Sequence, residues 1–129
     1  MTRLLTVPAF ACACGGLVTA LAVAHARATP ASGSQTVHVV VGRPLEFGFT
    51  VTPGRVHTGV VMFRISNTGL IPHDFQIRGR KTAPIPPHKS VVLRVEFPRP
   101  GRYTYVSTLP GQIAAGLIGR LVVTADSRR

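Results

Sequence analysis

The chain is poor in acidic residues and in cysteine, and it has no tryptophan. Only 4 of its 129 residues are Asp or Glu, against 15 Lys or Arg, so the formal net charge is +11. Few carboxylates are therefore present to form the acid and base pairs of an enzyme. Both cysteines, Cys12 and Cys14, lie near the amino terminus, so the remainder of the chain has no disulfide. We expect a non-enzymatic domain whose stability comes from packing alone.

Residues 1–28 have the pattern of a secretory signal. Arg3 precedes an apolar run, and the segment ends in small residues with the spacing that signal peptidases require, so cleavage is expected near Ala26 or Ala28. The alternative is an uncleaved single-pass anchor, because the apolar run is close to spanning length. Only in that case do we expect the protein at a membrane. We predict an exported protein that is periplasmic, bound to the cell surface or secreted.

The positive charge is scattered along the chain, with no run of five or more basic residues. Such a distribution is typical of a solvated surface, and it also favours attraction to anionic cell-surface polymers, lipid headgroups or an acidic protein. Nucleic acid is not an expected partner, because the protein is predicted to be exported and has few aromatic side chains on which bases could stack.

Short apolar or alternating runs follow a polar lead-in at residues 29–35. These runs occupy residues 36–42, 44–51, 59–66, 73–79, 90–97, 101–107 and 118–124. Turn-forming Pro, Gly and Asn residues separate them, and only residues 111–117 could form a helical turn. We predict an all-β sandwich of about seven strands in two antiparallel sheets, covering residues 36–125 and followed by a basic tail, 126–129.

One of these runs, residues 44–51, makes a specific prediction about side-chain direction. Its alternation places Leu45, Phe47 and Phe49 on one face of a strand and Glu46 on the other.

The segments NTGLIPHDFQI (67–77) and PGRYTYVSTLPGQIAAGLIGRLVV (100–123) resemble two motifs of the cupredoxins, in that family's order and spacing. The cupredoxins are blue-copper Greek-key β-sandwiches that include plastocyanin, azurin and auracyanin. The resemblance implies that the four copper-ligand positions, occupied in the family by His, Cys, His and Met, fall on His73, Ser107, Gln112 and Leu117.

The resemblance thus implies a degenerate copper site in which only His73 is a retained ligand. A type 1 copper site needs a cysteine thiolate, which the Ser107 hydroxyl cannot replace. Gln112 offers an amide oxygen in place of imidazole, and Leu117 keeps the volume of methionine without its sulfur. His73 alone is insufficient for copper and has the alternative role of a hydrogen-bonded structural residue. Asp74 is expected either to bond backbone amides between the two loops or to face solvent.

The function expected from these observations is that of a non-redox binding or interaction module without a cofactor. Its partner would be an unknown protein or an anionic cell-surface component. The two loops would form an apolar contact patch of Leu70, Ile71, Pro72, Leu109, Pro110, Ile113 and Leu117. The same side chains could instead only cap the end of the sandwich.

The alternative function is copper binding or copper handling outside the cytoplasm, through His73 and the other histidines. Cleavage after Ala24 would contribute His25 as a free amino-terminal chelator of Cu(II). Electron transfer follows from analogy of fold only.

Overall fold

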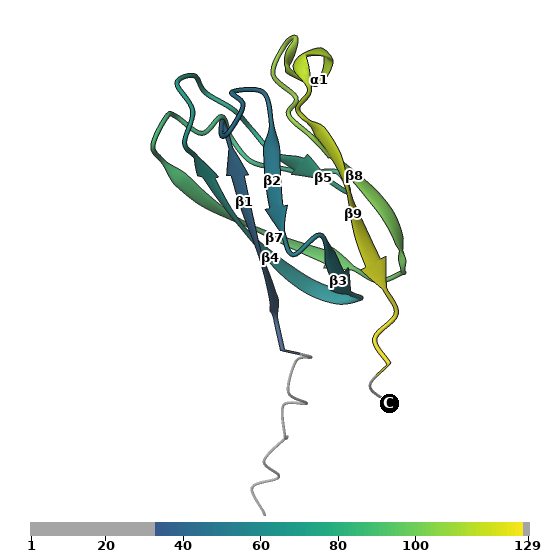
Figure 1. The fold of residues 1–129 in the computed structure, drawn as a ribbon. Helices are drawn as coiled ribbons and strands as arrows, with labels where there is room; N and C mark the ends of the chain where they lie inside the picture. Colours follow the sequence, from purple (N-terminus) through teal and green to yellow (C-terminus); the bar gives the residue numbers. More distant parts are fainter. Residues whose placement is uncertain (1–32, 128–129) are drawn as a thin grey trace, which may run out of the picture.

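Two β-sheets face each other in the computed structural model, which describes residues 33–127 (Figure 1). The predicted signal segment, most of the lead-in and the last two residues of the basic tail lie outside the described residues. Within the described part, no helix is long and apolar enough to cross a membrane.

The elements follow one another as short strands with one helical turn between the last two. They are β1 (Gln35–Val41), β2 (Phe49–Thr52), β3 (Arg55–His57), β4 (Gly59–Asn67), β5 (Gln76–Ile77), β6 (Arg80–Lys81), β7 (Ser90–Phe97), β8 (Gly101–Val106), α1 (Gln112–Ala115) and β9 (Ile118–Thr124).

The sheets have the strand orders β2-β1-β4-β7 and β3-β9-β8-β5-β6. Most neighbouring strands are antiparallel, but β1 pairs with β4 in parallel, and so does β3 with β9. The expected β-sandwich is confirmed, whereas the expectation of purely antiparallel sheets is wrong. A parallel pair joins strands that are not consecutive in the chain, and strand alternation carries no information about such a partner.

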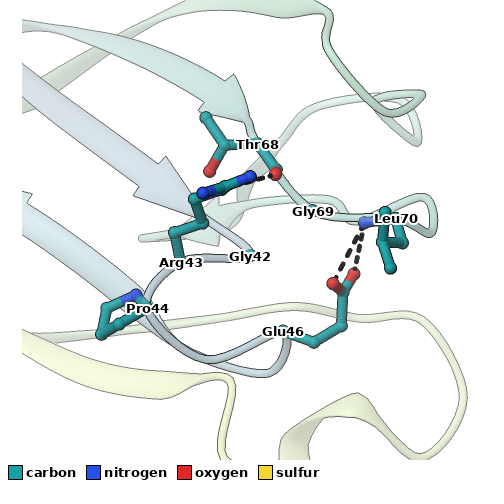
Figure 2. Close-up of a pocket in the computed structure, with 7 residues that line it drawn as sticks. All are labelled: Gly42, Arg43, Pro44, Glu46, Thr68, Gly69 and Leu70. Carbon is teal, nitrogen blue, oxygen red and sulfur yellow. Dashed lines mark hydrogen bonds between the residues drawn. The ribbon is translucent and has the colours of Figure 1, made fainter.

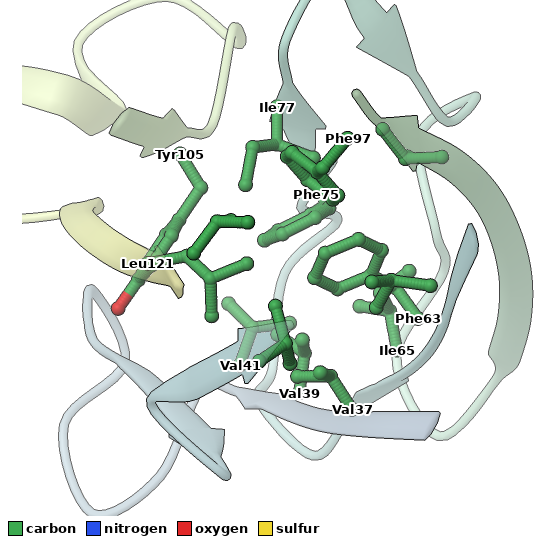
Figure 3. Packing of buried hydrophobic residues seen from close by; sticks show 14 of the residues in the cluster. Val37, Val39, Val41, Phe63, Ile65, Phe75, Ile77, Phe97, Tyr105 and Leu121 are labelled. Atoms are coloured by element: carbon green, nitrogen blue, oxygen red, sulfur yellow. The ribbon is translucent and has the colours of Figure 1, made fainter. Parts of the chain in front are cut away.

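The core lies between the sheets and consists of the inward-facing positions of both (Figure 3). Val37, Val39 and Val41 of β1 are fully buried at every second position, as the alternation of that strand predicts. Phe75 lies at the centre of an aromatic cluster and stacks on Tyr105, with ring centroids 5.7 Å apart. Since no disulfide joins the sheets within the described residues, this apolar contact holds them together.

The predicted strand at residues 44–51 is a loop over most of its length, and β2 begins only at Phe49. Gly42 ends β1 with a φ of 92°, a left-handed conformation that glycine adopts readily. Its N–H donates to the carbonyl of Gly48 at 3.2 Å, which closes the loop. Leu45 is consequently 70% exposed and Phe47 37% exposed. The prediction that these two side chains share a strand face with Phe49 is therefore wrong, because only Phe49 lies in a strand.

Candidate functional site

The four positions assigned by the motif resemblance lie at one end of the sandwich. The β1–β2 loop, the segment after β4 and the β8–β9 connection that contains α1 meet there (Figure 1). Within this cluster, His73, Ser107 and Leu117 are fully buried and Gln112 is nearly so. The structure therefore brings these four side chains together, although the two motifs are far apart in the sequence.

Backbone contacts fix the position of His73 after β4. Its N–H donates to the Ile85 carbonyl at 3.2 Å, and the Ile85 N–H donates back to the His73 carbonyl at 2.7 Å. Asn67 organises the turn before it, since its amide nitrogen donates to the carbonyls of Ile71 at 2.9 Å and Ile85 at 2.8 Å. The Asn67 side-chain oxygen accepts from the Gly69 N–H at 2.9 Å. The buried Asn67 side chain thus links the turn before His73 to the backbone at Ile85, which pairs with His73.

Both ring nitrogens of His73 have hydrogen-bond partners. Nδ1 lies 2.9 Å from the side-chain oxygen of Gln112, and Nε2 lies 2.9 Å from a carboxylate oxygen of Glu46. The Gln112 amide nitrogen donates to the Pro72 carbonyl at 3.0 Å, which fixes the orientation of the amide. Both atoms that face the ring are acceptors, so the arrangement is fully hydrogen-bonded only when both ring nitrogens carry a proton.

Ser107 connects Gln112 to Asp74 on the inner side of the cluster. Its hydroxyl oxygen lies 2.6 Å from the Gln112 side-chain oxygen and 2.8 Å from an Asp74 carboxylate oxygen, so one proton serves two acceptors. Asp74 also accepts from the Thr108 N–H at 2.6 Å and from the Thr108 hydroxyl. Asp74 is buried, so of its two expected roles the structure shows the bridge between the loops.

The α1 segment closes the cluster with two glycines in left-handed conformations. Gly111 has a φ of 78° and Gly116 a φ of 124°. A Cβ on Gly116 would lie 2.9 Å from the carbonyl oxygen of Phe47, so the β1–β2 loop and this segment are in close contact. The carbonyl of Leu117 accepts from the Ser107 N–H at 3.1 Å, and its side chain fills the interior. Leu117 is therefore not part of an exposed patch, contrary to our expectation.

Glu46 is the residue of this site that the sequence did not predict. Besides the contact with His73, its carboxylate accepts from the Leu70 N–H at 3.0 Å (Figure 2). It also accepts from the Ile71 N–H at 3.2 Å. Partial burial acts to raise the pKa of this carboxyl, but the hydrogen bond to His73 and those from the two backbone N–H groups outweigh it and lower the pKa below 4.5.

A surface hollow of about 420 Å³ lies beside the Glu46 carboxylate. Its lining residues are Gly42, Arg43, Pro44, Glu46, Thr68, Gly69 and Leu70 (Figure 2). The hollow gives solvent access to Glu46, whereas His73 behind it has none. The signal that could have revealed Glu46 is the bracketing of residues 43–47 by two glycines with a proline between them, which favours a loop over a strand.

Several apolar side chains are exposed around the buried cluster. We call them the apolar end, which consists of Leu45, Phe47, Leu70, Ile71 and Ile113. Leu70 is 81% exposed, and Phe47 packs edge-on against His73 with ring centroids 6.1 Å apart. Of the other residues expected on the patch, Pro72 and Pro110 are exposed, and Leu109 is half-buried.

The other histidines of the described chain do not join His73. His57 lies in β3, where its Nδ1 is 3.1 Å from the Thr124 hydroxyl. His38 is exposed on β1, and His88 is exposed in the loop before β7. Among residues 33–127, no group of three or more His, Cys, Asp or Glu side chains could hold a metal ion. Among the described residues, the Ser107 hydroxyl forms no hydrogen bond with His73. The pair therefore lacks the hydrogen bond through which a histidine activates a serine nucleophile.

Neither a known sequence family nor a curated protein sequence matches the chain. Solved protein structures, by contrast, do match the chain. The chain is similar to auracyanin A, a "blue" copper protein from Chloroflexus aurantiacus, with a TM-score of 0.57 and 18% identity over 71% of this chain and 100% of that one. It is also similar to rusticyanin from Thiobacillus ferrooxidans, with a TM-score of 0.56 and 24% identity over 70% of this chain and 79% of that one.

A third similar structure is the McoA multicopper oxidase from Aquifex aeolicus, with a TM-score of 0.59 and 16% identity. The match covers 73% of this chain and 30% of the oxidase. At such identities the likeness concerns the fold. The chain has a cupredoxin-like fold, as the two motifs predicted.

Proposed function

We propose that the protein is an exported, non-redox interaction module that docks through the apolar end of its cupredoxin-like sandwich. The observation that carries this proposal is the closed hydrogen-bond cluster around His73. Each ring nitrogen of His73 already has a partner, and its side chain is 0% exposed. A metal would have to displace Gln112 from Nδ1 or Glu46 from Nε2.

The residues at the remaining positions do not fit a type 1 copper centre. Such a centre needs a thiolate in trigonal geometry with imidazole. Ser107 offers a hydroxyl already shared between two acceptors, Gln112 an amide oxygen that faces Ser107 and His73, and Leu117 an aliphatic chain. We therefore propose no electron transfer at this site. Copper handling is a weaker alternative than the interaction role.

The apolar end supports an interaction role. Soluble proteins rarely expose contiguous apolar side chains, and where they do, the patch usually contacts a partner. The cluster beneath it holds the three contributing segments together, because Glu46 bonds to the backbone of the segment after β4 and Gln112 bonds to His73. A partner would therefore meet a preorganised surface, which reduces the entropy lost on binding.

Copper titration tests the first half of the proposal. We expect no tight stoichiometric binding of Cu(II) by the wild-type protein. The triple variant Ser107→Cys, Gln112→His, Leu117→Met restores the family's ligand types and should gain intense visible absorption on addition of Cu(II). Stoichiometric wild-type binding that disappears in His73→Gln would overturn the non-metal assignment.

Site-specific photo-crosslinking in the producing cell tests the second half. A photoreactive residue at Leu70 or Ile113 should give a discrete adduct with one partner. The control is Val92, an aliphatic residue that is 54% exposed on β7 and is not part of the apolar end. Equal adducts from Val92 and Leu70 would contradict docking through the apolar end. Amino-terminal sequencing of the extracytoplasmic form tests export.

A further inference from the structure

A second surface of the molecule carries a charge pattern that the apolar end does not explain. It is the outer face of the sheet β3-β9-β8-β5-β6. Arg55 of β3 and Arg102 of β8 are both paired with Val122 of β9, so they flank it on either side. Arg120 lies two residues before Val122 on the middle strand. Three adjacent strands therefore each present one arginine.

The three arginines point outward. Val56, Leu121 and Tyr105, at inward positions of the same strands, are buried in the core, and side chains alternate between the two faces of a strand. Arg55, Arg102 and Arg120 are all exposed. Arg78 lies beyond the end of β5 in a turn, with a φ of 49°, so strand alternation does not place its side chain on this face. We call Arg55, Arg102 and Arg120 the arginine band.

Sheet geometry sets the spacing of the band. Arg120 is a diagonal neighbour of Arg55 and Arg102, at roughly 7–8 Å between backbones. Arg55 and Arg102 are separated by two strand spacings, about 10 Å. Like charges that are exposed and lie about one Debye length apart repel one another only weakly at physiological salt. A polyanion that bridges them would gain attraction from all of them at once.

The carboxylates of residues 33–127 form no salt bridge with the band. The outward positions of β3, β8 and β9 contain no acidic residue. Glu46 and Asp74 belong to the cluster around His73, and Glu96 lies on β7 of the other sheet. Asp126 follows the end of β9, and within residues 33–127 none of the band arginines forms a salt bridge. The band is thus a group of three exposed cations on three neighbouring strands.

We propose that the arginine band binds a linear polyanion that carries a phosphate group in each repeat and no bases. Charge complementarity and the linear order of the cations favour an extended chain laid across the strands. All three positions are arginine, whose planar fork donates two hydrogen bonds to one phosphate. The outer face offers no Phe, Tyr or Trp side chain at its exposed positions for base stacking. This proposal is independent of the function assigned to the apolar end.

Titration with short inorganic polyphosphate tests the proposal, using calorimetry at two salt concentrations. Arg102→Gln combined with Arg120→Gln should weaken binding about 25-fold, since each arginine near a polyanionic surface contributes about five-fold. It should also reduce the slope of log K against log salt by about two. The matched control is Arg64→Gln with Arg94→Gln, which removes the same charge from exposed positions of β4 and β7.

The control double variant should lose less than about three-fold in affinity. Equal losses of affinity in the two double variants would show that net charge alone attracts the polyphosphate, and would contradict binding at the arginine band. Polyglutamate, vesicles containing anionic phospholipid and a single-stranded oligonucleotide form the comparison arms. Tighter binding to any of these than to polyphosphate would overturn the assignment of a base-free phosphate polymer.

Discussion

Replacement of Gln112 by leucine separates the hydrogen bonds of the buried cluster from its packing. The substitution keeps a side chain of similar volume at a position that is 6% exposed. It removes the contacts of the amide with His73 Nδ1, the Ser107 hydroxyl and the Pro72 carbonyl. Ser107 keeps Asp74 as a partner, but His73 Nδ1 loses the partner that faces it.

The magnitude follows from these contacts. Three hydrogen bonds at about 1 kcal/mol each give a loss of about 3 kcal/mol, which includes part of the cost of an unpaired ring nitrogen. The more apolar leucine returns up to about 1 kcal/mol. We therefore expect the free energy of unfolding to fall by about 2–3 kcal/mol. For a domain of this size that corresponds to a decrease in Tm of roughly 10–20 °C.

Urea denaturation at pH 7, followed by far-ultraviolet circular dichroism, measures the difference. The control is Gln76→Leu, because Gln76 is half-buried on β5 and its side chain forms no hydrogen bond within residues 33–127. That variant should remain within about 0.5 kcal/mol of the wild type. A Gln112→Leu protein as stable as Gln76→Leu would refute the view that hydrogen bonds in place of a metal hold the three loops together.

Three further outcomes are expected. The pKa of Glu46 is lowered in the folded state, so the ionised carboxylate stabilises the fold above pH 4.5, and this contribution is lost as the pH falls through the lowered pKa. The free energy of unfolding, measured as the pH is lowered, should show this loss in the wild type and not in Glu46→Gln. Asn67→Ala removes three hydrogen bonds, two of them buried, and should cost about 3 kcal/mol in urea unfolding. A loss under about 1 kcal/mol would contradict its role in the turn. Gly119→Ala would drive a Cβ into the ring of Tyr105 and should cost about 1–3 kcal/mol by thermal unfolding, whereas Gly54→Ala, with nothing within 4 Å of the added Cβ, should be nearly neutral.

Much of the fold could be predicted from local patterns. The alternation in β1 and β7 identifies their inward faces correctly, because a strand turns successive side chains to opposite faces whatever its partner. The two glycine- and proline-marked motifs predicted the cupredoxin-like arrangement. In the structure Gln112 bonds to both His73 and Ser107, two residues that come from different motifs.

The sequence by itself determined most strand faces and turns, since these depend on neighbours within a few residues. Only the tertiary structure decided that β1 pairs with β4 in parallel, that residues 44–48 form a loop and that Glu46 reaches His73. These features depend on groups from segments distant along the chain. A hydrogen bond between two loops exists only once both sheets are packed, and no local pattern encodes it.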